Sequence, residues 1–169
     1  MVDFNINKNN IVYNNNVNFK GKNEMQNDNK KEFDNMYIID GIYNEDDYEG
    51  YLTFHTNTHN KKLVAHFNIL DKSNLAKYEI GNKIPGELSI SDIFGCKKVS
   101  PVELDSIIQE SGLNTNTEII GSITDKNSDG DFIITSKGIP IVSCLTDDIL
   151  NPKINDKIYI KGLLDIDIE

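Results

Sequence analysis

Short apolar runs separated by polar turns follow one another from Met36 to the C-terminus of the chain. The runs are rich in Ile, Val, Phe, Tyr and Thr and are bounded by Gly, Asn and Asp, which is the pattern of short β-strands joined by tight turns. In "EGYLTFH" the alternation directs Leu52 and Phe54 toward a core and their neighbours outward. The chain is therefore predicted to be mainly β.

One segment between two groups of strands has a helical pattern instead. "SPVELDSIIQESGLN" places Ser100 as an N-cap, followed by a proline and a capping-box glutamate, and Gly112 as a stop. Three apolar residues would then share one helical face: Leu104, Ile107 and Ile108. We predict one connecting α-helix within residues 97–116, packed against the β-structure or wedged within it.

The order of strands is repeated along the chain. The phrase "GNKIPGELSISDI" at residues 81–93 resembles "NDKIYIKGLLDIDIE" at residues 155–169. The apolar matches are Gly86, Leu88 and Ile90 with Gly162, Leu164 and Ile166; Leu52 and Phe54 with Phe132 and Ile134; and Ile38, Ile39 and Ile42 with Ile119, Ile120 and Ile123. Differences in spacing fall in polar loops, where insertions are tolerated best. The pattern predicts an internal repeat.

Three of these phrases, "IIGSITD", "KLVAHFNIL" and "NDKIYIKGLL", stand in the order of the first strand, third strand and returning strand of a known barrel. The chain resembles the oligonucleotide/oligosaccharide-binding (OB) barrel, specifically the bacterial single-stranded-DNA-binding type. The resemblance implies two tandem OB-like barrels from the repeat, joined by the helix. The predicted organisation is an Asn-rich polar arm at 1–36, a first barrel at 37–96, the connecting helix at 97–116 and a second barrel at 117–169.

A candidate binding surface follows from the alternation in the first barrel. Its outward residues would be Tyr51, His55, His66 and Asn68, with Lys61 and Lys62 at the tip of the hairpin. An aromatic ring can stack on any base and lysine neutralises phosphate, so these residues are a candidate single-strand nucleic-acid platform. The first hypothesis is thus an accessory factor that binds single-stranded nucleic acid.

Charge supports a different class of partner. The chain carries 27 acidic against 17 basic residues, a net charge of -10, and every basic residue is lysine. A surface of this sign repels phosphate and attracts a basic groove, and arginine, the residue best suited to gripping phosphate, is absent. The alternative is therefore an acidic protein-binding or inhibitory factor, for example a nucleic-acid mimic, acting on a basic partner protein.

Other classes lack a sequence signal. The chain shows no nucleophile elbow or phosphate-binding glycine loop, so we expect no enzymatic activity. No apolar run approaches the roughly 20 residues of a membrane span, and the N-terminus lacks a secretory apolar region. The two cysteines, Cys96 and Cys144, have no paired spacing. We expect a cytoplasmic protein with reduced thiols and no membrane partner.

One motif suggests a metal. In "DKNSDGDF" the oxygen-bearing residues Asp125, Asn127, Asp129 and Asp131 resemble the opening of a calcium loop. The pattern then departs, because its twelfth position falls on Ser136 instead of a glutamate. Asn-Ser-Asp-Gly is also a favourable hairpin turn. Two readings follow: a turn without any cofactor, or a Ca²⁺ site.

Overall fold

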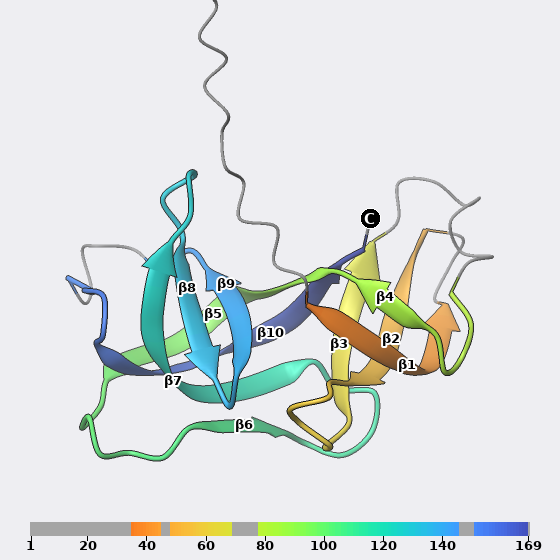
Figure 1. Cartoon of the computed structure of the whole chain (residues 1–169), viewed down its shortest axis with the longest axis horizontal. Coiled ribbons are helices and arrows are strands. Elements are labelled where there is room, and N and C mark those ends of the chain that lie inside the picture. Colours follow the sequence, from red (N-terminus) through yellow and green to blue (C-terminus); the bar gives the residue numbers. More distant parts are fainter. Residues whose placement is uncertain (1–34, 45–47, 69–77, 146–150, 169) are drawn as a thin grey trace, which may run out of the picture.

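The computed structural model describes residues 35–44, 48–68, 78–145 and 151–168, and these residues form ten strands (Figure 1). The strands are β1 (Met36–Asn44), β2 (Glu49–His55), β3 (Leu63–Asn68), β4 (Lys83–Pro85), β5 (Glu87–Lys98), β6 (Ser106–Gln109), β7 (Asn116–Lys126), β8 (Phe132–Ser136), β9 (Ile139–Ser143) and β10 (Lys157–Asp167). The predicted mainly β class is confirmed. The predicted arm at 1–36 lies almost wholly outside the described residues. The described part of the chain contains no helix that could cross a membrane.

Five of the strands close into a barrel. β7, β8 and β9 form an antiparallel meander, β9 pairs in parallel with β5, and β10 lies antiparallel between β5 and β7. This pairing order is compatible with an OB-like barrel. Four of the five strands come from the segment predicted as the second barrel, but β5 comes from the segment predicted as the first barrel.

Four further strands extend from the same sheet. β4, β1, β2 and β3 follow in that order, and β3 pairs in parallel with the end of β10, where His66 lies opposite Asp165. β10 therefore belongs to both parts of the molecule: its first residues pair with β7 and its last residues with β3. The two predicted segments do not form separate units in series, because each contributes a strand beside the other.

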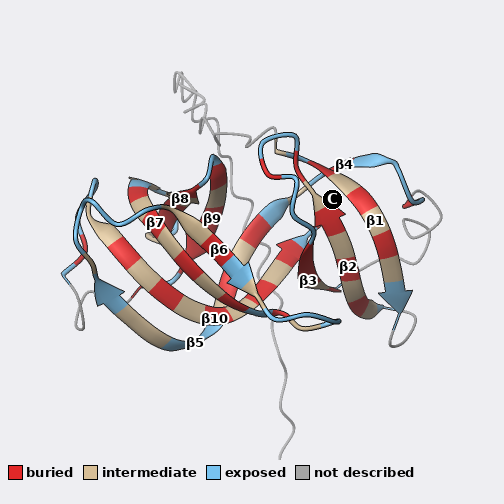
Figure 2. Cartoon of the chain, turned by 90° about the horizontal axis from the view of Figure 1, so that it is seen from below, coloured by how far each residue is buried: buried red, intermediate tan, exposed pale blue. Residues whose placement is uncertain are grey.

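A single apolar cluster runs through both parts of the molecule. Buried and less buried residues alternate along the strands, as Figure 2 shows. On β2 the alternation places Leu52 and Phe54 inside, as predicted. The Phe54 ring packs edge-on against Tyr37 of β1 at a centroid distance of 5.1 Å. The period of two along each strand thus builds the core directly.

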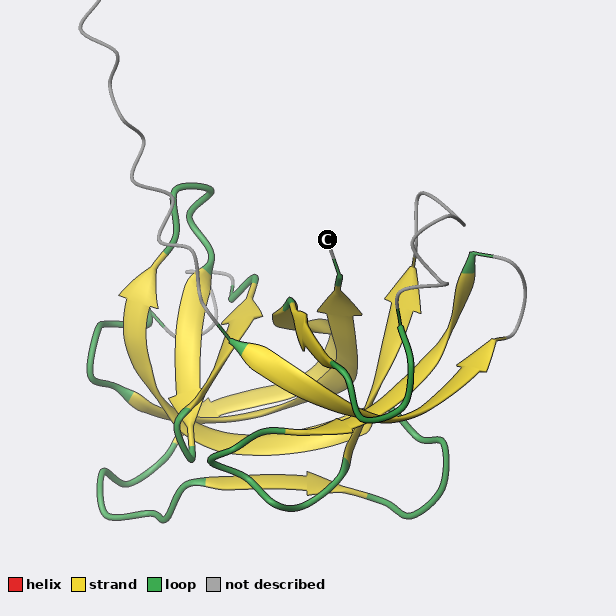
Figure 3. Cartoon of the chain, turned by 45° about the vertical axis from the view of Figure 1, so that its right-hand side comes forward, coloured by secondary structure: helices red, strands yellow, loops and turns green. Residues whose placement is uncertain are grey.

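The predicted helix at 97–116 is wrong. This segment contains the end of β5, a turn and β6, and Figure 3 draws it as loop and strand. β6 pairs with β7, so Ile107 is buried while the adjacent Ile108 is exposed, and Leu104 is 84% exposed. Two consecutive β-branched residues suit a strand that buries one face. Cross-strand pairing therefore outweighs the capping signals, which act only at the ends of a helix.

Candidate binding surfaces

The predicted platform on β2 and β3 forms one face of a hairpin. We call it the hairpin face: Tyr51, His55, His66 and Asn68, with Lys61 and Lys62 in the turn. Its rings are half-buried and its lysines and Asn68 are exposed, whereas the alternate residues of β2 are buried. The outward orientation predicted for these side chains agrees with this burial pattern. Val64 occupies the same alternation as His66 and Asn68, which would direct it outward, but it is buried.

Two rings of the hairpin face contact each other. Tyr51 lies opposite His66 across the β2–β3 pair, with ring centroids 5.8 Å apart and planes at 68°. His66 also lies between two carboxylates: its Nε2 is 3.8 Å from Glu49 Oε2 and its Nδ1 is 3.6 Å from Asp165 Oδ1. The Ser91 hydroxyl donates to the other oxygen of Asp165. The His66 ring thus has a carboxylate near each of its two nitrogens.

A third carboxylate contacts the other end of the hairpin face. Asp40 Oδ2 lies 2.8 Å from His55 Nδ1, and Asp40 Oδ1 lies 3.5 Å from Lys62 Nζ. Both histidines and one of the two lysines of the face therefore have a carboxylate partner. A phosphate approaching this face would compete with those carboxylates and be repelled by them. The arrangement lowers the capacity of the hairpin face for a polyanion.

The calcium-loop candidate is organised around an amide. Asn127 Oδ1 accepts hydrogen bonds from the backbone N–H of Asp129 at 3.1 Å and of Asp131 at 2.8 Å. The Asp125 carboxylate accepts from the N–H of Lys126, and Asp131 Oδ1 accepts from the Cys144 thiol at 2.9 Å. The bonds accepted by Asn127 Oδ1 are those of an Asx turn. Within the described ranges, no group of three or more His, Cys, Asp or Glu side chains could hold a metal ion.

A second surface was missed by the sequence prediction. Residues 99–115, which we call the β6 segment, carry large apolar side chains in solvent: Val102 is 85% exposed, Leu104 84%, Ile108 53% and Leu113 47%. Among the described strands, β6 pairs only with β7, so its second edge has no strand beside it. The prediction placed Leu104 and Ile108 on a buried helical face. The signal that could have found this surface is the Ile107–Ile108 pair, which a strand splits between its two faces.

The β6 segment also carries carboxylates. Glu103 and Glu110 are exposed, and Asp105 is paired with Lys157 of β10. Near the end of β6, the Gln109 side chain holds the edge of β3: its Oε1 accepts from the Val64 N–H at 2.8 Å and its Nε2 donates to the Val64 carbonyl at 2.7 Å. The segment is thus anchored at both ends of β6 while its apolar side chains face solvent.

The chain was compared with known proteins at the levels of family, sequence and structure. No protein-family model, no curated protein and no solved structure matches it. Function must therefore be argued from the two surfaces themselves: the self-paired hairpin face and the apolar, acidic β6 segment.

Proposed function

We propose that this chain is a protein-binding factor whose partner adds an extended, basic and apolar segment to the open edge of β6. The observation that carries the proposal is the exposure of Val102 and Leu104 in the residues that lead into β6, whose second edge has no described strand beside it. Exposed groups of large apolar side chains mark interaction sites, and an unpaired strand edge is a template for another strand. Strand addition supplies backbone hydrogen bonds, and the apolar side chains supply contact area.

Charge specifies the chemistry of that partner. Glu103 and Glu110 lie exposed within the β6 segment, and the whole chain has a net charge of -10. Complementary charge speeds association and excludes wrong partners more than it adds affinity. A partner strand in which lysine or arginine alternates with apolar residues would match both the carboxylates and the exposed apolar side chains of the β6 segment. This proposal corresponds to the acidic protein-binding alternative.

Selection from a random linear-peptide library displayed on phage tests the proposal. The full chain serves as bait, and the double variant Val102→Ser/Leu104→Ser serves for counter-selection. We expect enriched peptides in which basic and apolar residues alternate. A synthetic peptide from that set should bind the double variant at least tenfold more weakly than the wild-type chain, because two exposed apolar contacts are lost. Added salt should weaken its binding to the wild-type chain.

The matched control is Ile80→Ser, which removes another exposed apolar side chain, 72% exposed, away from the β6 segment. It should bind the selected peptide as the wild-type chain does. Failure to enrich any peptide family, or enrichment of peptides that bind the double variant equally well, would contradict the proposal.

A second candidate is single-stranded nucleic acid on the hairpin face. It is supported by the OB-like pairing order of the closed barrel and by the contact of Tyr51 with His66. Fluorescence anisotropy with a labelled oligonucleotide tests it, at low and at moderate salt. Saturable binding that is lost in Tyr51→Ala and weakened in Lys61→Glu would favour this candidate over the first. We expect no saturable binding, because carboxylates occupy the face.

We further infer that the chain consists of two OB-like halves, related by an internal repeat, that exchange strands. The predicted repeat matches Leu88 with Leu164 and Ile90 with Ile166. In the β5–β10 pair Leu88 lies opposite Ile166 and Ile90 opposite Leu164, as expected if a two-fold axis passes between Ser89 and Asp165. In each half, too, the third strand pairs in parallel with the closing strand of the other half.

Two glycines support the same inference. A Cβ on Gly162 would lie 2.5 Å from the backbone oxygen of Ser91, and a Cβ on Gly86 would lie 2.8 Å from that of Asp167. The repeat that matches Gly86 with Gly162 also matches Ser91 with Asp167. The two halves would thus use glycine for the same reason, a close approach of backbones along the β5–β10 pair. β1 has a bulge at Asp40 where it pairs with β2, and β7 has a bulge at Thr124 where it pairs with β8. If the two bulges are equivalent, β1 and β7 match with an offset three residues larger than in the sequence alignment.

A further inference from the structure

The pairings of β1 and β7 agree residue by residue once their bulges are matched. The match places Ile38 of β1 at the position of Ser122 of β7. The residues opposite Ile38 are His55 of β2 and Lys83 of β4. The residues opposite Ser122 are Thr135 of β8 and Lys157 of β10. Lys83 and Lys157 are also the lysines of the repeated phrases "NKI" and "DKI", so register and sequence agree.

β7 has a further neighbour, β6. Residues Thr117–Ile120 of β7 pair with β10 on one edge and with β6 on the other. Ser122 pairs with both β10 and β8, so β6 and β8 occupy the same edge of β7, one after the other. At the junction, the Ser136 hydroxyl of β8 donates to the Ser106 carbonyl of β6 at 3.2 Å. The start of β7 is thus covered by a strand that precedes it in the chain.

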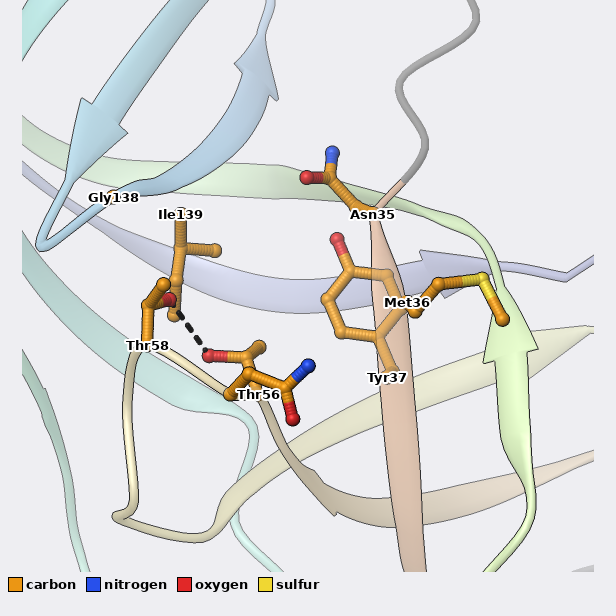
Figure 4. A pocket seen from close by; sticks show the side chains of 8 residues that line it. Asn35, Met36, Tyr37, Thr56, Thr58, Gly138 and Ile139 are labelled. Atoms are coloured by element: carbon orange, nitrogen blue, oxygen red, sulfur yellow. Dashed lines mark hydrogen bonds between the residues drawn. The ribbon is translucent and has the colours of Figure 1, made fainter.

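The corresponding place beside β1 is open among the described residues. The residues that match Ile119 and Ile120 are Asn35 and Met36. β2 pairs with β1 only from Ile38 onward, so no described strand lies on that edge of Asn35 and Met36. A cavity of about 220 Å³ lies there, bounded by the start of β1 and by the turn residues Thr56–Thr58 (Figure 4). Met36 is 40% exposed, whereas Ile119 is fully buried.

The chain has a strand-like segment of its own before β1. In residues 11–19, "IVYNNNVNF", apolar residues alternate with polar ones at all odd positions except one: Ile11, Tyr13, Val17 and Phe19. This pattern is typical of a strand that buries one face. Residues 20–34 connect the segment to Asn35, and an extended residue spans about 3.3 Å. The connection is therefore long enough for the segment to turn back and lie antiparallel to β1, as β6 does on β7.

We propose that residues 11–19 of this chain add to the edge of β1 at Asn35 and Met36, as the counterpart of β6. The open edge supplies backbone hydrogen bonds, and the alternating apolar side chains gain a buried face. The residues that line the cavity are uncharged, and so is the segment 11–19. The β6 segment, with exposed Glu103 and Glu110, favours a basic strand instead. The inference rests on the inferred equivalence of the two halves and is independent of the partner of the β6 segment.

Amide hydrogen exchange of the full chain, followed by NMR, tests the proposal. We expect alternate amides within residues 11–19 to exchange at least tenfold more slowly than in a free peptide of the same sequence, because they pair with β1. Val17→Ser/Phe19→Ser removes two apolar contacts and should abolish this protection. It should also shift the amide signals of Met36 and Thr58, which border the cavity.

The matched control is Val2→Ser/Phe4→Ser, which makes the same two changes in the arm outside the segment. It should leave the exchange rates of residues 11–19 and the signals of Met36 and Thr58 unchanged. Equal loss of protection in the control and in Val17→Ser/Phe19→Ser would contradict the assignment to residues 11–19.

Three other results would overturn the proposal. The first is exchange at the free-peptide rate throughout residues 11–19. The second is protection that is lost on dilution, because the strand would then come from a second copy of the chain. The third is a shift of the signals of the β6 segment in place of Met36 and Thr58, which would place the strand on β6. The equivalence of the halves is tested separately: if Gly86→Ala and Gly162→Ala both destabilise the chain while residues 11–19 stay unprotected, the docking alone has failed.

Discussion

The β2–β3 and β8–β9 hairpins have corresponding places in the strand order but different outward pairs. Each hairpin follows a long bulged strand, and each is joined in parallel to the closing strand from the other part of the chain. In the first hairpin Tyr51 lies opposite His66, with their rings in contact. At the matching position of the second, just beyond the strand ends, the Cys144 thiol donates to Asp131.

The two hairpins are alike at their inward residues and differ at their outward residues. Inward positions are apolar in both hairpins: Leu52 and Phe54 in the first are buried, and so are Phe132 and Ile134 in the second. Outward positions differ in size, charge and aromatic character. Folding thus fixes the inward residues through packing, while the outward residues are free to carry binding chemistry. Any activity that distinguishes the two hairpins must come from those outward pairs.

The largest effect is expected at the two glycines that let β5 and β10 approach closely. Gly162→Ala places a methyl group 2.5 Å from a backbone oxygen, so the paired strands must move apart, and we expect a loss of about 3 kcal/mol in the free energy of unfolding. Gly86→Ala should cost about 2 kcal/mol, since its contact is 2.8 Å. Urea denaturation followed by circular dichroism measures both.

The control for these two substitutions is Gly95→Ala, within β5. Its added methyl would meet nothing closer than 4.0 Å, so stability should change by less than about 0.5 kcal/mol. If one of the two closely packed glycines tolerates alanine and the other does not, the equivalence of the two halves breaks at that point.

A smaller effect is expected at the contact between Gln109 of β6 and the first hairpin. Gln109→Ala leaves the N–H and C=O of Val64, a buried residue, without their side-chain partners. Unpaired buried groups of this kind cost about 1–3 kcal/mol, so we expect a loss of about 2 kcal/mol. Thermal unfolding of Gln109→Ala and of its exposed neighbour variant Glu110→Ala makes the measurement. Equal melting temperatures for the two variants would show that the Gln109 bridge does not stabilise the edge of β3.

The outward pair of the first hairpin depends on a carboxylate of β10. Asp165→Asn weakens the contacts with His66 and Ser91 while keeping the side chain's shape. We expect a loss of about 1 kcal/mol, the typical net contribution of a hydrogen bond to stability, because the asparagine keeps an acceptor oxygen. Asp167→Asn, at an exposed position two residues further on, should be neutral. A neutral Asp165→Asn would mean that the hairpin face is not fixed from β10 and is more easily reorganised by a ligand.

Much of this architecture could be predicted from the sequence. Alternation along β2 and β3 identified the buried and outward residues because a strand has a period of two, and the only failure there is Val64, which is covered from β6 by Gln109. Pairing between distant strands could not be predicted in the same way. Periodicity is local, so it contains no information that β5 would lie beside β9 and β10 beside β3.

The candidate surfaces show the same limit. The residues of the hairpin face were identified, but their carboxylate partners Asp40 and Asp165 come from β1 and β10, which only the fold brings near. The β6 segment was misassigned because capping residues describe the ends of a helix and do not determine whether its middle is helical. Val102 and Leu104 lie in the segment predicted to be helical, and they are the most exposed large apolar residues in the described part of the chain.

The smallest effect concerns the outward pair of the second hairpin. The hydrogen bond to Asp131 raises the pKa of the exposed Cys144 thiol, since the carboxylate disfavours a thiolate beside it. Asp131→Asn should therefore lower that pKa, increase the thiolate fraction at pH 8 and speed iodoacetamide alkylation several-fold, because the thiolate is the reactive form. Cys96 is the internal control: burial raises its pKa to about 11, so it should stay slow in both proteins. Unchanged alkylation of Cys144 would mean that the thiol is not bonded to Asp131 in solution, and the Asx turn around Asn127 alone would then hold this hairpin's end.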